Sequence, residues 1–428
     1  MAATRLRALF TGWVREAATL LTGTAGAQVI TVAAYFLLTR LYTSDDFGLF
    51  GIFCSYIELL TIASTCKYEL SIVASADERQ ASAVAGFALR LNAAFSVVLL
   101  AAVGAMVALG ALPGKTAQLG ALVLLIPPLI YFNGTSRVYE NLFNRRRRYA
   151  KIGLSETVNA SSTVLVKAGM GWLGAAPAGL PVGTVVGRMA GNIVYRLGLR
   201  RLELPRTTAA ERRQAAVNNR NYPLYVAPKD LANSLSYNLP MLWMAHYFDL
   251  TEAGLFTLAL TFTFRPINVV NVAIEKVLYA RAVEHRTHGT PMWPEVRQFL
   301  ATALAIALPV GLLLFLFADP LFAFFFGAKW GACGYYVRCL LPWVLVMLLT
   351  NSLMYVSNVF STQRVEFVFC LVLLGLRAAA VVAGIALGSF RTGILLFCVV
   401  STAVSAALLW WYIHQIARHD RSLHKTTE

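Results

Sequence analysis

The sequence predicts an all-α polytopic membrane protein with about twelve transmembrane helices in two pseudo-symmetric six-helix lobes around a central cavity. Three observations support this prediction: the composition, a series of long apolar stretches and a sequence pattern that occurs twice. Of 428 residues, 58% are hydrophobic and only 14% are charged. Soluble domains carry roughly 25% charged residues, so the composition indicates a chain embedded in a membrane.

The apolar stretches give the elements in order. Each is long enough to cross a bilayer, for which roughly 20 apolar residues suffice. No loop exceeds about two dozen residues, which leaves no room for a soluble catalytic domain. The twelve expected spans are 16–39, 47–74, 83–111, 118–141, 151–173, 180–199, 220–245, 253–280, 298–318, 333–360, 366–388 and 393–416.

The repeated pattern divides these spans into two halves. Residues 42–50 read YTSDDFGLF and residues 248–256 read FDLTEAGLF, so the second copy lies 206 residues after the first. The same shift carries Glu69 onto Glu275. Two equivalent halves are the usual plan of a secondary transporter, with the binding site where the halves meet. We therefore expect an N-terminal lobe at 1–199, a cytoplasmic linker at 200–219 and a C-terminal lobe at 220–428.

The net charge of +16 is distributed in a way that argues against a nucleic-acid partner. With the spans placed as above, 22 basic residues in loops, in termini or at the ends of spans fall on one side of the membrane. Only four, Arg40, Lys115, Lys329 and Arg391, fall on the other side. Cytoplasmic loops are the basic ones, so we expect both termini in the cytoplasm and an even number of spans.

No motif of an enzyme or a metal site is present. The sequence contains no phosphate-binding glycine loop, HExxH, Cys-x-x-Cys or nucleophile elbow. His285 and His288 share one short loop and are read as solvated side chains. We expect no metal and no cofactor, although coupling to a proton or sodium gradient stays open.

Charged residues inside the expected spans carry most of the functional information. Eleven are basic and six are acidic, and each charge at the bilayer centre costs about 2.5–3.5 kcal/mol on insertion scales. Most must therefore face a wet interior or a partner, and the excess of positive charge favours a cavity for an anionic substrate. The cations expected to bind that substrate are Arg265, Lys229, Lys67, Arg137, Arg188 and Arg90.

Polar residues spaced three and four apart place hydrophilic faces on equivalent helices of both halves. The faces lie on the first, second and fourth spans and on the seventh, eighth and tenth. The fifth span also has one, at Glu156, Asn159, Thr163 and Lys167, which does not fit the symmetry. The polar residues expected to line the cavity are Gln28, Thr31, Asn233, Asn268, Asn271 and Asn351.

Several of these charged residues allow two interpretations. Arg265 precedes Pro266 near mid-span, where proline bends a helix, and is either a substrate contact or half of a structural salt bridge. Glu69 and Glu275, together with Glu58, are candidates for gate ion pairs or for ion coupling. The run Arg145 to Arg148 is read as a topology determinant, with attraction of anionic lipid headgroups as the alternative.

Three stretches resemble a known family. They are LLTRLYTSDDFGLFGIFCSY, KYELSIVAS, which ends at Ser75, and FFGAKWGACGYY, which ends at Tyr336. They are similar to sequences of bacterial polysaccharide transporters, the Wzx-type O-antigen flippases of the multidrug/oligosaccharidyl-lipid/polysaccharide exporter superfamily. The resemblance implies two lobes and a cationic cavity lined by the first, second, seventh and eighth helices.

It further implies a function in lipopolysaccharide or exopolysaccharide synthesis at the bacterial inner membrane. The expected activity is transfer of an undecaprenyl-diphosphate-linked oligosaccharide from the inner to the outer leaflet by alternating access. The partners would be that glycan lipid and membrane lipids, with other polysaccharide assembly proteins as further candidates and no nucleic acid.

Rival functions remain open at this point. A multidrug or cation antiporter of the same superfamily would need an acidic cavity, and such exporters often carry an acidic residue in the first helix. Nothing acidic lies between Glu16 and Asp45 here. Lipid II flippases generally have fourteen helices. A membrane-bound glycan polymerase or ligase usually has a large outer loop, and a scaffold protein would not need polar faces in both halves.

Overall fold

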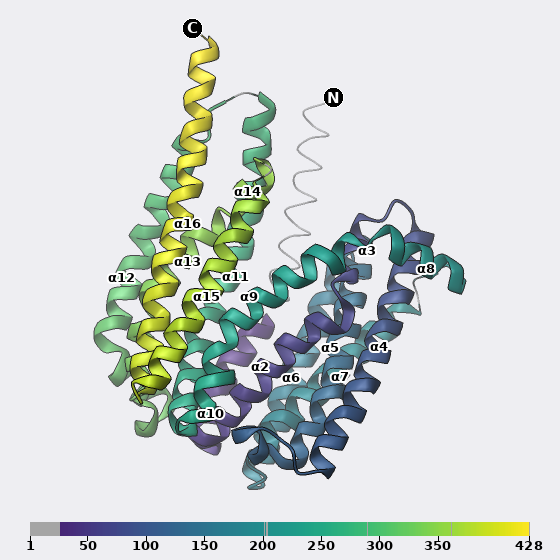
Figure 1. Cartoon of the computed structure of the whole chain (residues 1–428), viewed down its shortest axis with the longest axis vertical. Coiled ribbons are helices and arrows are strands. Elements are labelled where there is room, and N and C mark those ends of the chain that lie inside the picture. Colours follow the sequence, from purple (N-terminus) through teal and green to yellow (C-terminus); the bar gives the residue numbers. More distant parts are fainter. Residues whose placement is uncertain (1–25, 201, 203, 289, 361, 428) are drawn as a thin grey trace. The chain divides into compact units, whose positions relative to one another are not determined.

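The computed structural model describes residues 26–427 apart from 201, 203, 289 and 361, although some side chains within 268–288, at 358 and 363 and after 421 are left out. The described residues form helices and turns, with no strand (Figure 1). By their internal contacts they divide into unit 1, Met1–Ser234, and unit 2, Leu235–Glu428. The boundary expected at 200–219 stays a prediction.

Unit 1 is a bundle in which α5 is central, since it contacts α2, α4, α6 and α7. Helix α8 lies across α4 and leads into α9, which continues into unit 2. The helices are Gly26–Leu41, α2 (Ser44–Thr65), α3 (Ser71–Ala74), α4 (Glu78–Ala108), α5 (Ile126–Arg145), α6 (Tyr149–Trp172), α7 (Gly179–Leu199), α8 (Ala209–Asn218) and α9 (Ala227–Leu239).

Unit 2 is built around α13, which contacts α11, α12 and α16, and α15 packs beside α16 (Figure 1). Its buried core at one end joins Leu278, Val296, Tyr355, Val356 and Tyr412. Its helices are α10 (Ala245–Tyr247), α11 (Leu250–His288), α12 (Trp293–Phe326), α13 (Cys333–Ser352), α14 (Tyr355–Val359), α15 (Gln363–Ala386) and α16 (Phe390–Thr427).

The expected fold class is confirmed, and the described part of each of the twelve expected spans is helical, in one element or in several consecutive ones. Seven helical segments in the described part are long and apolar enough to cross a membrane by length and composition. Others, such as α6 and α7, carry more polar residues because they pack against each other. Twelve is therefore an approximate number of spans.

Two expected spans are broken. The second is interrupted where Cys66 and Lys67 adopt left-handed backbone angles, with φ of 47° and 61°. The chain then continues as the 3₁₀ turn η1 (Tyr68–Leu70) and α3. Glu69 therefore does not continue the α-helical face of α2 that the sequence pattern suggested. In the seventh span, α9 lies between two π-helical turns, η3 (Tyr222–Val226) and η4 (Pro240–Met244), which contain Pro223 and Pro240.

A row of glycines explains the close pairing of α6 and α7. Gly183, Gly187 and Gly191 repeat every four residues on α7, a spacing that lets two membrane helices approach closely. A Cβ atom at Gly183 would stand 3.1 Å from the backbone nitrogen of Lys167, and one at Gly191 would stand 3.1 Å from the carbonyl oxygen of Ser155. The polar face of the fifth span is thus largely a packing surface, which accounts for its departure from the symmetry.

Gly187→Ala should destabilise the protein, because the new Cβ would lie 2.7 Å from the backbone carbonyl oxygen of Asn159 and would also meet the Thr163 side chain. Overpacking of this kind costs about 1–3 kcal/mol. Gly169→Ala on α6 is the matched control, since nothing lies within 4 Å of its Cβ position. Thermal unfolding in detergent should show a lower midpoint for Gly187→Ala only; equal midpoints would contradict this packing.

Candidate functional site

The best-defined polar cluster of unit 1 lies between α5, α6 and α7. Arg188 of α7 donates to Glu156 of α6 at 2.9 Å, and each side chain is 27% exposed. Asn159, one turn after Glu156, donates to the other carboxylate oxygen at 3.3 Å. The pair is thus neither fully buried nor fully exposed, and the guanidinium is held in place by the carboxylate.

Asn192 fixes the position of Arg188 relative to α5. Its amide nitrogen donates to the carbonyl oxygen of Phe132 and to the Ser136 hydroxyl, each at 2.9 Å, and to the carbonyl oxygen of Arg188 itself. Asn192 is buried, so these bonds are made away from solvent. The turn of α7 that carries Arg188 is thereby tied to α5.

Arg137 and Glu140 of α5 complete the cluster. Electrostatic interactions connect the Glu140 carboxylate with Glu156, Arg188 and Arg137. Arg137 is half-buried, and within the described part of the chain it forms no ion pair. The cluster thus contains two cations and two anions, of which one pair is bonded directly and one cation, Arg137, has no bonded counter-charge.

A second ion pair connects the interruption of the second span to α9. Lys67 pairs with Asp230 of α9 at 2.8 Å. Glu69 is 2% exposed, and its Oε2 atom has no hydrogen-bond partner among the described atoms. Glu58 is exposed on α2, and Lys229 is half-buried on α9 with no ion pair in the residues described. The predicted roles of these residues in binding, gating or coupling stay predictions.

The predicted cavity residues of unit 2 lie on α11 and α13. Arg265 is half-buried and forms no ion pair with any described residue, and α11 continues through Pro266. Asn271 is buried and accepts a 3.4 Å hydrogen bond from Ser352, and its amide nitrogen has no hydrogen-bond partner among the described atoms. Asn351 is half-buried beside Ser352. The side chains of Asn268 and Glu275 lie outside the described residues.

The remaining predicted residues do not gather into one place. Gln28 and Thr31 are half-buried on Gly26–Leu41, and Thr31 donates to the carbonyl oxygen of Ala27 in its own helix. Arg90 is exposed on α4, and Asn233 is exposed on α9. Each unit thus contributes polar groups, and their assignment to one cavity stays a prediction.

Arg377 is one of the eleven basic residues inside the expected spans, and its buried environment was not predicted from the sequence. Its guanidinium is 2% exposed and donates to the hydroxyls of Ser401 at 2.8 Å and Ser236 at 3.1 Å. The group also lies over the rings of Trp343 and Phe397, 4.6 and 4.7 Å from their centres. The guanidinium is thus contacted by serine hydroxyls and aromatic rings, whereas an acidic side chain would be the expected partner of a buried arginine. The signal was available: Arg377 is the one charge in the expected span 366–388 apart from Glu366 at its start.

The repeated pattern proves to be structural. Asp46 accepts from the backbone nitrogen of Thr43 at 2.8 Å and caps the start of α2. Its equivalent Glu252 accepts from Arg391 at 3.0 Å and from the Tyr336 hydroxyl near the start of α11. An acidic residue thus stabilises the start of an equivalent helix in both halves. The sequence pattern that occurs in both halves therefore stabilises the first turns of two helices, and these contacts do not involve a substrate.

Arg377→Lys should destabilise unit 2, because an ammonium cannot stack on both rings while bonding both serines. Loss of one hydrogen bond and of the cation–π contacts together is worth about 1–3 kcal/mol. Arg364→Lys, at an exposed position near the start of the same helix, is the control. Thermal unfolding followed by the fluorescence of buried tryptophans should separate the two variants. An unchanged midpoint for Arg377→Lys would show that the cage around Arg377, formed by Ser236, Ser401, Trp343 and Phe397, contributes nothing to stability.

The family model described as polysaccharide biosynthesis protein matches residues 37–334, which is most of the chain. The chain belongs to this polysaccharide biosynthesis family. The resemblance expected from the sequence is thereby confirmed. No curated protein matches the sequence significantly.

Solved structures show the fold of this family member. The lipid II flippase MurJ in an inward closed conformation has a TM-score of 0.76 at 10% identity, over 94% of this chain and 90% of that one. An inward-facing multidrug resistance transporter of the MATE family has a TM-score of 0.64 at 14% identity, over 96% of both chains. A MOP superfamily transporter from Pyrococcus furiosus, described as having a binding pocket of reverse polarity, has a TM-score of 0.64 at 14% identity, over 95% of both chains.

Proposed function

We propose that this protein is a flippase that moves an undecaprenyl-diphosphate-linked oligosaccharide, an O-antigen or exopolysaccharide repeat unit, between leaflets by alternating access. Membership of a polysaccharide biosynthesis family and the fold of lipid and multidrug transporters support a transporter in this process. Both the nature of the cargo and its direction of movement, from the inner to the outer leaflet of the bacterial inner membrane, belong to the proposal.

The observation that carries the proposal is Arg137. A guanidinium inside a membrane-spanning helix is expensive unless something compensates its charge. Arg137 is half-buried and has no ion pair among the described residues, while its neighbour Arg188 is already bonded to Glu156. A diphosphate would supply the directly bonded anion that Arg137 lacks beside Glu140, because guanidinium groups bind phosphate oxygens through two parallel hydrogen bonds.

Arg188 would contribute by exchanging partners. Its bond to Glu156 keeps the guanidinium neutralised in the absence of cargo, and the 27% exposure of both side chains leaves it within reach of a ligand. Binding of a diphosphate would then replace or share that bond. An inside-negative potential favours outward movement of an anion by about 2.3 kcal/mol per charge per 100 mV. Glu58, Glu69 and Glu275 remain candidates for additional ion coupling.

Arg137→Gln and Arg188→Gln should each lower glycan export about 10-fold or more, since a charge-assisted hydrogen bond is worth about 1.5–3 kcal/mol. The measurement is surface glycan in cells that carry each variant as the only copy, at matched protein levels. Arg40→Gln, an exposed position at the end of the first described helix, is the charge-matched control and should export normally.

Glu156→Gln separates cargo binding from a purely structural salt bridge. If the pair only stabilises the bundle, Glu156→Gln and Arg188→Gln should impair export equally, because either change breaks the same bond. If Arg188 binds the cargo, Glu156→Gln leaves the cation free and export persists, while Arg188→Gln lowers export about 10-fold or more. Equal loss in both variants, or full export from Arg137→Gln, would overturn the proposed site.

A further inference from the structure

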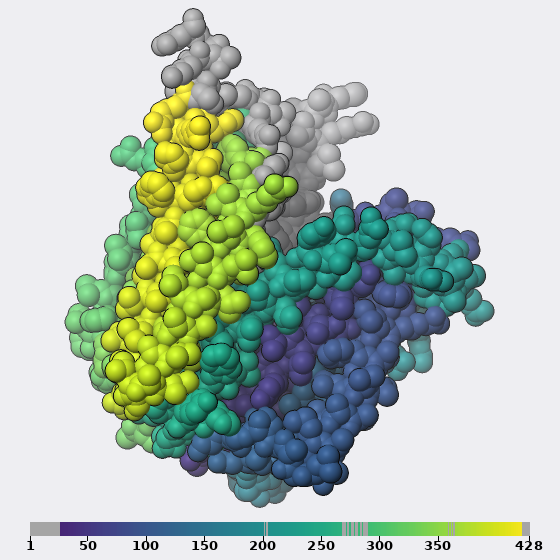
Figure 2. Space-filling view, in the orientation of Figure 1, coloured from purple at the N-terminus to yellow at the C-terminus, as the bar shows by residue number. Residues whose placement is uncertain are grey.

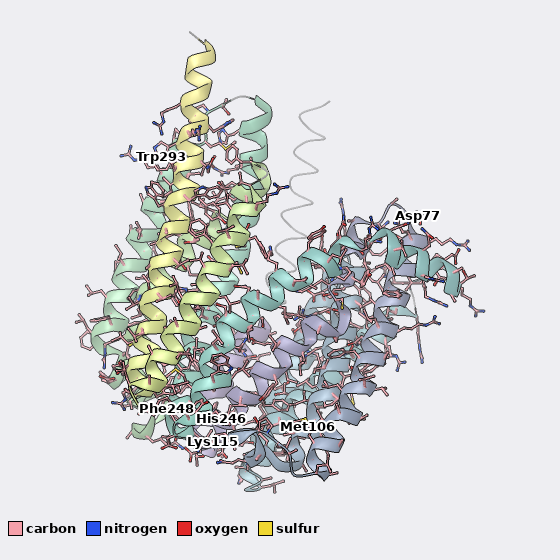
Figure 3. All side chains as sticks on the ribbon, viewed as in Figure 1. Asp77, Met106, Lys115, His246, Phe248 and Trp293 are labelled. Atoms are coloured by element: carbon pink, nitrogen blue, oxygen red, sulfur yellow. The ribbon has the colours of Figure 1, made fainter. Side chains whose placement is uncertain are left out.

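One end of unit 1 is formed by three segments that are far apart in the sequence: the turn between α5 and α6, the end of α7, and α8. Two buried clusters join them. One contains Phe143, Tyr195 and Leu202, and the other contains Tyr68, Val84, Ala215 and Ala216. The side chains of Leu199 and Leu204 pack against both clusters. Asp77 lies at this end of α4, and Lys115 lies at the opposite end of unit 1 (Figure 3).

Helix α8 lies on this end with a defined orientation. Ala215 and Ala216 are buried against α4, and the Tyr68 hydroxyl donates to the carbonyl oxygen of Ala216. Its start is capped by Thr208 and Glu211, and the Thr208 backbone bond and the Arg79 guanidinium lower the pKa of the Glu211 carboxyl. The small apolar face of α8 thus packs on unit 1, the Arg212 side chain lies against Gly86 of α4, and Arg213 is exposed. The outer side of α8 lies at the surface of the molecule (Figure 2).

Some arginines at this end have structural partners. Arg145 donates to the carbonyl oxygens of Ile72, Val73 and Ser75, where α3 ends. Arg146 donates to Glu78 at 2.8 Å. The run of four arginines in the sequence therefore separates into two that fix the fold and two that do not.

Six other arginines are exposed and form no side-chain hydrogen bond or ion pair with any residue that the structure describes. They come from these three segments and from the residues that flank α8, so this end of unit 1 carries six unneutralised charges. They are Arg147, Arg148, Arg200, Arg206, Arg213 and Arg220.

Large apolar side chains stand among these arginines. Val217 of α8 is 53% exposed, and Leu224 and Tyr225, which follow it in η3, are 58% and 71% exposed. A surface that combines basic and apolar groups is typical of segments that lie in the membrane interface, where headgroups and acyl chains meet. A soluble polyanion such as RNA would use the charges and leave the apolar groups in water.

We propose that these six arginines form a binding surface for the phosphate groups of anionic phospholipids in the adjacent leaflet, with Val217, Leu224 and Tyr225 inserted among the acyl chains. The surface is distinct from the α5–α7 cluster and does not depend on which glycan is carried. Its effect is to hold α8 on the membrane, and α8 is connected through η3 to α9, which bears the partner of Lys67.

The test is a binding titration of the purified full chain in neutral detergent with fluorescent phosphatidylglycerol, followed by anisotropy. Detergent removes membrane orientation from the measurement, so a residue that acts only as a topology determinant has no effect. The wild type should bind phosphatidylglycerol at least 10-fold more tightly than phosphatidylcholine. The paired variants Arg147→Gln/Arg148→Gln and Arg206→Gln/Arg213→Gln should each weaken binding about 10-fold or more, in line with roughly five-fold per basic residue.

Arg40→Gln/Lys115→Gln removes the same charge outside this surface and should leave binding unchanged. Equal affinity for the two lipids, or equal affinity of the wild type and both paired variants, would overturn the proposal. Displacement of the lipid by inorganic phosphate at equal concentration would also contradict it, because the site would then recognise a free phosphate rather than a lipid. If a paired variant cannot be purified, Arg148→Gln and Arg213→Gln are measured singly, with about five-fold weakening expected for each.

Discussion

The free energy of a charge inside a membrane is the constraint on which this structure depends. The chain meets it in three ways. Arg188 and Lys67 are bonded to the carboxylates of Glu156 and Asp230. Arg377 is surrounded by serine hydroxyls and aromatic faces. Arg137 and Arg265 are half-buried with no ion pair among the described residues. These three environments suit different roles, because only the last leaves a cation with no directly bonded partner among the described residues.

Close helix packing is what makes these environments possible. In a membrane the hydrophobic effect does not drive helices together, so they need small residues at which backbones can approach. The glycines of α7 provide such a surface for α6, and the polar side chains of α6 lie against it. Glu156 and Arg188 face each other across this contact. The geometry of the candidate site therefore depends on residues that carry no charge and touch no cargo.

The sequence predicted the fold class, the positions of the spans and the family, because apolar length and charge distribution are set by the bilayer and are visible in one dimension. It did not predict that the second span breaks at Cys66 and Lys67, since neither residue is a usual helix breaker. Helical periodicity also does not distinguish a polar face that packs against another helix from one that faces water. The polar face of α6, which packs against α7, is an example. The cage around Arg377 unites residues from positions 236 to 401, and such contacts cannot be read from spacing.

Recognition of a diphosphate by unpaired guanidinium groups is tested most directly by measuring lipid flipping in vesicles that contain the purified protein. The labelled lipids would be an undecaprenyl-diphosphate oligosaccharide and the same glycan on an uncharged undecaprenyl chain, with label in the outer leaflet quenched by an impermeant reagent. If unpaired guanidinium groups recognise the diphosphate, the charged lipid should cross rapidly and the uncharged lipid should not cross faster than in empty vesicles. Equal movement of the two lipids, or movement of neither, would contradict the central claim.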